Sequence, residues 1–207
     1  MQSISLSPTS YIQTFRICDV NVLIGSLELL RHLPFESTPF VEKLFLFPQF
    51  GNSLMNLMRF ERNKGNKQKI QQMIDEHLSL RIRHLSLQTL SSIQWAGGPN
   101  VQNQLILQNG YVNELIQCIG NGGGSFESNK RIIINSLESL RSIFTLLSDG
   151  ESWCPSQKQL IKSCEEIIEP ESGIEEIETH LFHIDQSVGK WVRLNGLWTK
   201  MILLQKW

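Results

Sequence analysis

Apolar residues in this chain recur mainly three and four positions apart, which places them on one face of an α-helix. Three segments share the pattern Ser-Leu-(Glu/Gln)-x-Leu-x-x-(Leu/Ile), beginning at Ser26, Ser86 and Ser136. The copies lie 60 and 50 residues apart, as their starting positions 26, 86 and 136 show. Self-similarity at such a spacing is typical of stacked helical repeats. The pattern therefore predicts a repeat architecture with this apolar stripe packed inside it.

Turn-forming residues divide the rest of the chain into stretches of helical length, and few segments alternate with period two. We predict an all-α fold, an α-solenoid of three to four irregular units. Residues 1–19 are expected to be an irregular lead-in and residues 20–207 one repeat domain. The expected helices cover 20–33, two short stretches within 39–60, 69–76, 80–93, 101–108, 111–119, 132–147, 156–168, 174–181 and 188–204. Ser156 is the expected N-cap of its helix, and Asn109-Gly110 an expected left-handed turn.

Composition narrows the functional classes. Of 207 residues, 41% are hydrophobic and 19% charged, and the formal net charge of −1 supplies no global basic field for non-specific nucleic-acid binding. The low charged fraction fits a surface covered by a partner, and equally a modestly polar free surface. No apolar run approaches the length of a membrane span, and residues 1–8 lack the features of a secretory signal. We therefore expect a nuclear or cytosolic protein.

The chemistry-bearing residues do not form a catalytic or metal-binding pattern. The four cysteines have no Cys-x-x-Cys spacing, which favours reduced, packed thiols over a zinc site (Cys18, Cys118, Cys154 and Cys164). His180 and His183 are one helical turn apart. For these two residues a surface or capping role is favoured over metal binding. The glycine-rich 120–125 segment lacks the Gly-Lys-(Ser/Thr) ending of a phosphate loop, so a flexible linker is expected. We expect no enzyme activity, no cofactor and no metal.

Residues 104–119 carry a resemblance to a known family. The order of a short helix, a Gly turn and a helix of the type Gly-x-(Ile/Val)-x-x-Leu-(Ile/Val) resembles an armadillo repeat, with Gly110, Val112, Leu115 and Ile116 at the matching places. The Ser-Leu-x-x-Leu stripe resembles the long third helix of such a repeat. The resemblance extends over residues 20–204 and is closest over 78–119. The units here are longer than the usual armadillo length of about 40 residues.

Two armadillo-type families give the resemblance a functional meaning. Importin alpha lines its peptide groove with Trp-x-x-x-Asn pairs, and residues 87–93 and 137–143 have neither residue. The C-terminal repeat domain of the ARID-bearing subunits of SWI/SNF chromatin remodellers is the better match, in segments 26–30, 48–50, 83–90 and 130–131. That resemblance implies a non-catalytic nuclear scaffold that binds other protein subunits, without a small-molecule substrate, a membrane or sequence-specific nucleic acid. The alternatives are a transport adaptor for cargo peptides and a regulatory domain of a larger cytosolic protein.

Two groups of residues are candidates for partner binding. Trp191 and Trp198 are seven residues apart and share a helix face, which suits either core packing or an exposed binding strip on an end unit. The second group is a small basic patch, which is either a solvated loop or a contact for phosphate groups (Arg59, Arg62, Lys64 and Lys67).

Overall fold

The computed structural model describes residues 17–32, 38–60, 69–120, 129–170, 172–182 and 188–206. The described chain is helical throughout, which confirms the predicted all-α class, and Glu151 and Cys154 form an isolated β-bridge. The elements in order are α1 (Ile17–His32), α2 (Thr38–Phe45), α3 (Pro48–Met58), α4 (Lys69–Ala96), α5 (Pro99–Asn103), a π-helical turn η2 (Gln104–Gln108), α6 (Tyr111–Ile119), α7 (Lys130–Asp149), α8 (Lys158–Ile168), α9 (Gly173–Thr179), a 3₁₀ turn η3 (His180–Phe182) and α10 (Val188–Lys206).

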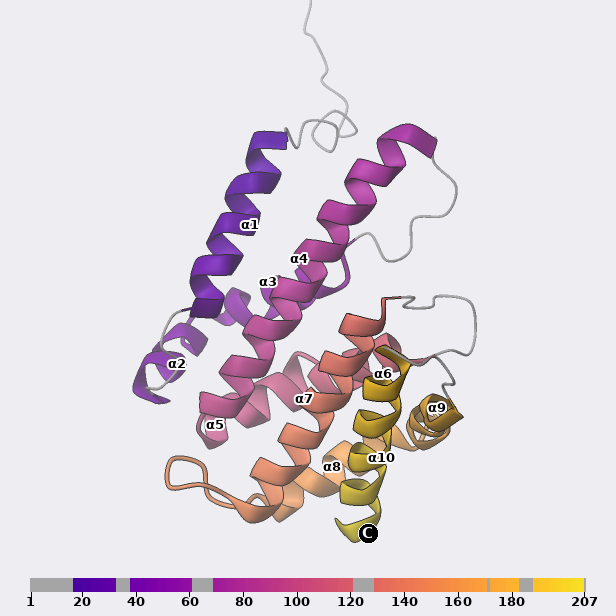
Figure 1. The fold of residues 1–207 in the computed structure, drawn as a ribbon. Coiled ribbons are helices and arrows are strands. Elements are labelled where there is room, and N and C mark those ends of the chain that lie inside the picture. Colours follow the sequence, from indigo (N-terminus) through magenta and orange to yellow (C-terminus); the bar gives the residue numbers. More distant parts are fainter. Residues whose placement is uncertain are drawn as a thin grey trace, which may run out of the picture.

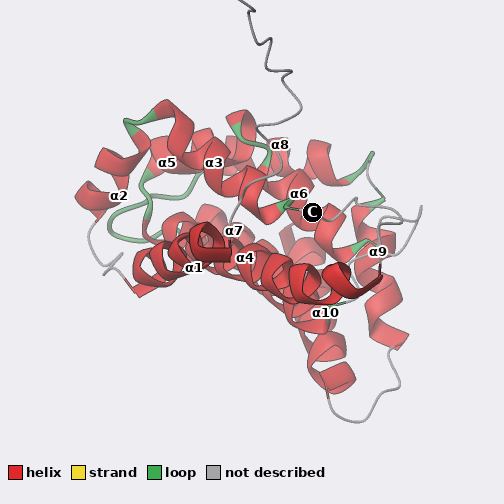
Figure 2. Cartoon of the chain, turned by 90° about the horizontal axis from the view of Figure 1, so that it is seen from above, coloured by secondary structure: helices red, strands yellow, loops and turns green. Residues whose placement is uncertain are grey.

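Four helices form a row that organises the molecule. Helix α1 packs on α4, α4 on α7, and α7 on α10 (Figure 1). Seen from above, these four helices follow one side of the molecule, and α2, α3, α5, α6 and α8 lie behind them (Figure 2). Helices α3 and α6 connect the two sides, because α3 packs on α4 and α6 on α7. We call α1, α4, α7 and α10 the helix row.

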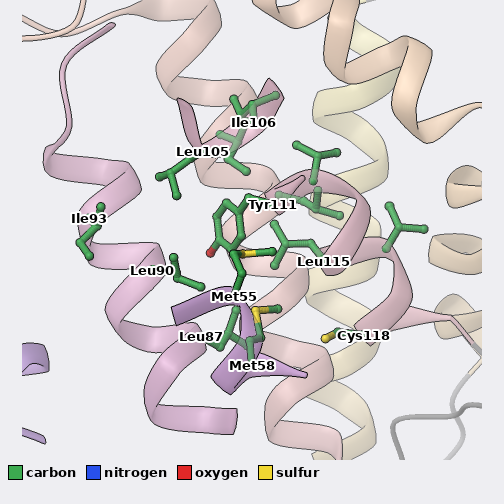
Figure 3. Close-up of a cluster of buried hydrophobic side chains, with 14 of the residues drawn as sticks. Met55, Met58, Leu87, Leu90, Ile93, Leu105, Ile106, Tyr111, Leu115 and Cys118 are labelled. Atoms are coloured by element: carbon green, nitrogen blue, oxygen red, sulfur yellow. The ribbon is translucent and has the colours of Figure 1, made fainter. Parts of the chain in front are cut away.

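The Ser-Leu-x-x-Leu pattern lies on three helices of this row. Its three copies fall on α1, α4 and α7, and their first leucines are at most 1% exposed (Leu27, Leu87 and Leu137). The interpretation of the pattern as a buried packing stripe is therefore confirmed. Between α4 and the helices behind it, Leu87 and Leu90 lie beside Met55 of α3 and Tyr111 of α6 (Figure 3), and Ile93 of the same helix is also fully buried. Each fully buried side chain of this size contributes about 1.5–3 kcal/mol.

Local sequence explains where α6 begins. Gly110 has a φ of 72°, the left-handed conformation that glycine adopts without strain, and it directly precedes Tyr111. The predicted turn at Asn109-Gly110 is thus confirmed. Helix α6 then buries Val112, Leu115 and Ile116, the positions that the 3.6-residue period assigns to its inner face.

Four sequence predictions about helix boundaries are wrong. The segments 69–76 and 80–93 form one continuous helix, α4, because no glycine or proline separates them. Residues 101–108 divide between α5 and the π-helical turn η2. Ser156 is not the N-cap of α8, since Gln157 takes that position and the Ser156 hydroxyl donates to the Leu147 carbonyl at 3.1 Å. Helix α1 begins at Ile17, inside the expected lead-in.

The described cysteine side chains behave as packing residues. Cys118, Cys154 and Cys164 are free thiols and buried. Burial raises the pKa of the Cys164 thiol to about 12, with a smaller contribution from the neighbouring Glu165 carboxylate. Such thiols are protonated and unreactive near neutral pH.

Candidate partner-binding site

Helix α10 has two apolar faces, and only one of them is covered. The covered face holds Val192 and Leu203, at most 2% exposed, against α7. The Thr199 hydroxyl on the same face donates to the Asn195 carbonyl at 2.8 Å and lies 3.1 Å from the Leu137 carbonyl of α7. These contacts fix the rotation of α10 about its own axis and thereby decide which residues point outward.

The outer face of α10 is a strip of large apolar side chains. Trp191 is 57% exposed and Trp198 is 41% exposed. Three further exposed residues follow at helical spacing along the same face (Leu197, Met201 and Leu204). We call these five residues the α10 strip. The sequence allowed two roles for these tryptophans, core packing or an exposed binding strip. Their exposure argues against core packing. Contiguous exposed apolar surface of this kind marks interaction sites in soluble proteins.

The charged residues of helix α10 itself have one sign. Helix α10 contains Lys190, Arg193 and Lys200 among its described side chains and no Asp or Glu anywhere in its sequence. Arg193 and Lys190 are exposed, whereas Lys200 Nζ pairs with Glu178 Oε1 at 2.5 Å. The Arg141 guanidinium of α7 lies 5.3 Å from the ring centre of Trp198, a cation–π contact that holds the indole in place. The strip is therefore apolar with basic flanks.

Sequence reasoning had missed this one-sided charge and the contributions of Lys190, Arg193 and Leu204. The usable signal was the acid-free segment 188–206, which lies beyond the glutamate-rich segment 165–178 and is separated from it by the nine residues 179–187. Its meaning depends on which face α7 covers, and only the fold supplies that information.

The structure does not bring the predicted basic patch together with the tryptophans. Arg59 follows α3, and its Nε lies 2.5 Å from Oε2 of Glu114 on α6, a carboxylate only 3% exposed. This ion pair links α3 to α6, so Arg59 is engaged within the molecule. Arg62, Lys64 and Lys67, the other members of the patch, lie outside the described residues.

His180 is structural. Its side chain is fully buried and its Nε2 lies 2.8 Å from the carbonyl oxygen of Ile119, the last residue of α6. The capping role is confirmed, and the alternative placement on the surface is wrong. His183 lies outside the described residues. Among the described residues, no group of three or more His, Cys, Asp or Glu side chains is placed to hold a metal ion.

Helix α10 does contain one Trp-x-x-x-Asn sequence, from Trp191 to Asn195. The asparagine, however, is 2% exposed, and its amide donates to the Trp191 carbonyl at 3.0 Å. Because Trp191 points outward and Asn195 inward, the two side chains do not form a shared surface. This pair therefore does not supply the groove-lining arrangement of importin alpha.

No protein-family model, no curated protein and no solved structure matches this chain. Within the described helices, none combines the length and the apolar character that a membrane crossing requires.

Proposed function

We propose that this chain is a non-catalytic scaffold for protein–protein binding and that the α10 strip is its main docking surface. The observation that carries the proposal is the second apolar face of α10, with Trp191 and Trp198 exposed while the first face is packed on α7. Tryptophan is enriched among the residues that dominate binding energy at interfaces. The exposed apolar face of α10 is in contact with water, which is unfavourable in free energy. A bound partner that covers the face removes this unfavourable contribution.

The partner segment that fits this surface is an amphipathic helix with an apolar stripe and acidic flanks. The α10 strip follows the helix axis from Trp191 to Leu204, which suits the anchors of a docked helix at i, i+3, i+4 and i+7 spacing. Exposed Lys190 and Arg193 border the strip without a carboxylate on the same helix. Acidic residues on the partner therefore increase the association rate and fix the orientation.

The proposed architecture is an α-solenoid of irregular armadillo-like units. Its support lies in the spacing of contacts: helices α4, α7 and α10 begin at residues 69, 130 and 188, about 60 residues apart. Side-chain hydrogen bonds along the row span similar separations, 57 residues for Arg31–Gln88, 48 for Ser91–Ser139 and 62 for Leu137–Thr199. Contacts limited to the next unit are the defining property of repeat arrays.

As the specific cellular role we propose a structural subunit of a SWI/SNF-type chromatin-remodelling complex in the nucleus. The sequence resemblance described above supports this assignment over a transport adaptor. The buried Asn195 adds to that preference, because α10 lacks an exposed asparagine beside its tryptophan. A role as a rigid hub requires no cofactor and no catalytic group in this chain.

The test is affinity purification of the tagged chain from nuclear extract, followed by quantitative mass spectrometry. The wild-type chain is expected to recover a remodelling ATPase and its associated subunits in near-stoichiometric amounts. The double variant Trp191→Ser/Trp198→Ser removes the two largest anchors of the α10 strip and is expected to lower that recovery at least tenfold.

The matched control is Leu46→Ser/Phe47→Ser, which removes two apolar side chains that are 78% and 68% exposed between α2 and α3. This control should recover the same proteins as the wild type. Recovery of chaperones alone would overturn the scaffold proposal. Equal recovery by the folded tryptophan variant would overturn the role of the α10 strip, and tight binding of a basic nuclear-localisation peptide would favour the adaptor instead.

A further inference from the structure

A polar cleft of about 430 Å³ lies between α1, α4 and the start of α7, on a part of the helix row distinct from the α10 strip. Helix α1 contributes Arg31, α4 contributes Arg81 and His84, and Arg131 lies in the first turn of α7. These residues are widely separated in the sequence and meet only because the three helices pack in a row. A pocket of this volume is large enough to enclose a small ligand or an amino-acid side chain.

The described lining of the cleft is positively charged. It contains three guanidinium groups and one carboxylate, that of Glu28, whose Oε1 pairs with Arg81 Nη2 at 2.6 Å. With the imidazoles neutral, the formal charge of the lining is therefore two positive units. Arg31 is held in place because its Nη1 donates to Oε1 of Gln88 at 2.9 Å, which orients one planar, multi-donor group toward the space between α1 and α4.

The same arginines act on an imidazole in the cleft. Burial lowers the pKa of His84 below its usual value, and the positive charges of Arg131 and Arg31 lower it further. Its Nε2 lies 2.9 Å from the amide nitrogen of Asn135, which donates to the unprotonated ring nitrogen of a neutral imidazole. The positive charges of Arg31 on α1 and Arg131 on α7 are thus both close enough to affect the His84 imidazole between them.

The beginning of α7 adds to the positive potential. Asn129, the N-cap, borders the cleft, and its Oδ1 accepts from the backbone N–H groups of Arg131 at 3.0 Å and Ile132 at 3.4 Å. Helix α7 is 20 residues long, so its first turn carries the positive end of a full helix dipole. The dipole supplements the arginines here and has no independent role.

We propose that this cleft binds a phosphate monoester carried by a phosphorylated serine or threonine in a partner's polypeptide segment. A phosphate monoester has a charge of about −1.5 to −2 at pH 7, which matches the net charge of the lining. Planar guanidinium groups bind its oxygens in pairs. The proposal is independent of the α10 strip, because no residue is common to the two sites.

A polypeptide phosphate suits the cleft better than a nucleic-acid backbone. A second cleft of about 270 Å³ continues from the first, shares Arg31 and Gln88 with it, and includes the carboxylate of Glu138. Glu28 and Glu138 therefore flank the arginine-rich point, and they repel the regularly spaced charges of a phosphodiester chain. Gln88, Ser92 and Asn135 line the second cleft with neutral donors and acceptors that suit peptide groups.

The test follows binding to the full chain by calorimetry and by the NMR signals of the His84 imidazole. The probes are a glycine–alanine decapeptide with one central phosphoserine, the same peptide without phosphate, and inorganic phosphate. We expect the phosphopeptide to bind, to shift the His84 signals and to raise the His84 pKa by compensating the arginine charge, while the unmodified peptide does neither. Arg131→Gln, at an exposed position, should weaken binding about tenfold, and Arg31→Gln/Arg131→Gln more strongly still.

The matched control is Lys158→Gln/Lys162→Gln, which removes two exposed positive charges from α8 and should leave binding unchanged. An equal loss in this control, or unchanged affinity in Arg131→Gln, would overturn the site. Inorganic phosphate binding as tightly as the phosphopeptide would overturn the assignment to a polypeptide segment. A single-stranded RNA oligonucleotide that binds more tightly than the phosphopeptide would also overturn that assignment and would identify the cleft as a nucleic-acid site.

Discussion

Helices α7 and α10 are neighbours in the same row, but α7 is an inner member of the row and α10 an outer one. Helix α7 lies between α4 and α10, and it buries Leu137, Leu140, Ile143 and Phe144 completely. Helix α10 packs on α7 through one face and presents Trp191 and Leu197 on the other. The difference separates apolar residues that stabilise the fold from apolar residues that are available for binding.

The polar residues of the two helices differ in the same way. In α7, Ser139 and Ser142 bond to Ser91 and Gln94 of α4 at 3.1 Å each, so polar groups tie α7 to its neighbour. In α10, Arg193 and Lys190 are exposed and directed to solvent. These serines thus tie α7 to its neighbour in the row, whereas Lys190 and Arg193 of α10 remain at the surface.

The largest effect is expected for truncation of a buried leucine in α7. Leu137→Ala removes a side chain that is 0% exposed and leaves a cavity, so we expect a loss of about 2–5 kcal/mol in the free energy of unfolding. The matched substitution in α10 is Leu197→Ala, at a position 42% exposed, and it should cost less than about 1 kcal/mol. Urea unfolding measures both. Similar losses would contradict the distinction between the two helices.

A smaller effect is expected for the hydroxyl that joins the two helices. Thr199→Val keeps the volume but removes the group that contacts the Asn195 and Leu137 carbonyls, so it should cost about 1 kcal/mol. Ser139→Ala is the counterpart at the α4–α7 contact. Chemical denaturation of both variants tests whether the two contacts of α7 depend equally on a hydroxyl. A stabilised Thr199→Val variant would show that packing alone fixes α10.

The cleft makes the α1–α4–α7 end of the row sensitive to pH. Because the pKa of His84 is lowered in the folded protein, the unfolded chain takes up a proton near its ordinary value of about 6.5 before the folded chain does. Stability from this group is therefore complete above that pH and is lost as the pH falls toward the folded pKa. His84→Gln should reduce the decrease in urea midpoint between pH 7.5 and pH 5.5. An unchanged decrease would show that other groups cause it.

The smallest effect on stability is expected at the α10 strip. Trp191→Ser should change the free energy of unfolding by no more than about 0.5 kcal/mol because its side chain is 57% exposed, whereas Trp198→Ser also loses the cation–π contact with Arg141, about 0.5–1 kcal/mol. Differential scanning calorimetry of the isolated chain provides this measurement. A large loss would mean that the tryptophans support the fold, and the binding experiment on the same variant would then lose its meaning.

The sequence predicted the helix row better than it predicted the surfaces. Repeated Ser-Leu-x-x-Leu segments around Leu27, Leu87 and Leu137 indicated stacked helices, because burial imposes a period that local sequence displays. The break predicted before residue 80 failed for a local reason. Residues 77–79 contain no glycine or proline, so nothing ends the helix there.

The binding surfaces were less accessible to sequence reasoning because they depend on long-range packing. The spacing of Trp191 and Trp198 places them on one face of α10, but α7 decides that this face is the exposed one. Arg31, Arg81 and Arg131 form a cleft only after three helices assemble, so no linear motif announces it. Sequence reasoning instead selected basic residues that are close together in the chain, between positions 59 and 67, and Arg59 among them forms an ion pair with Glu114.

The spacing of the contacts along the row also has a consequence during protein synthesis. Side-chain hydrogen bonds between α1 and α4, such as Arg31–Gln88, are complete once residue 88 has left the ribosome. Helix α7 then docks on a surface that already exists, and α10 docks in turn through Thr199. Because the chain is synthesised from its N-terminus, the helix on which each new helix packs has already emerged. Each later helix of the row therefore has an earlier neighbour to pack on by the time it emerges.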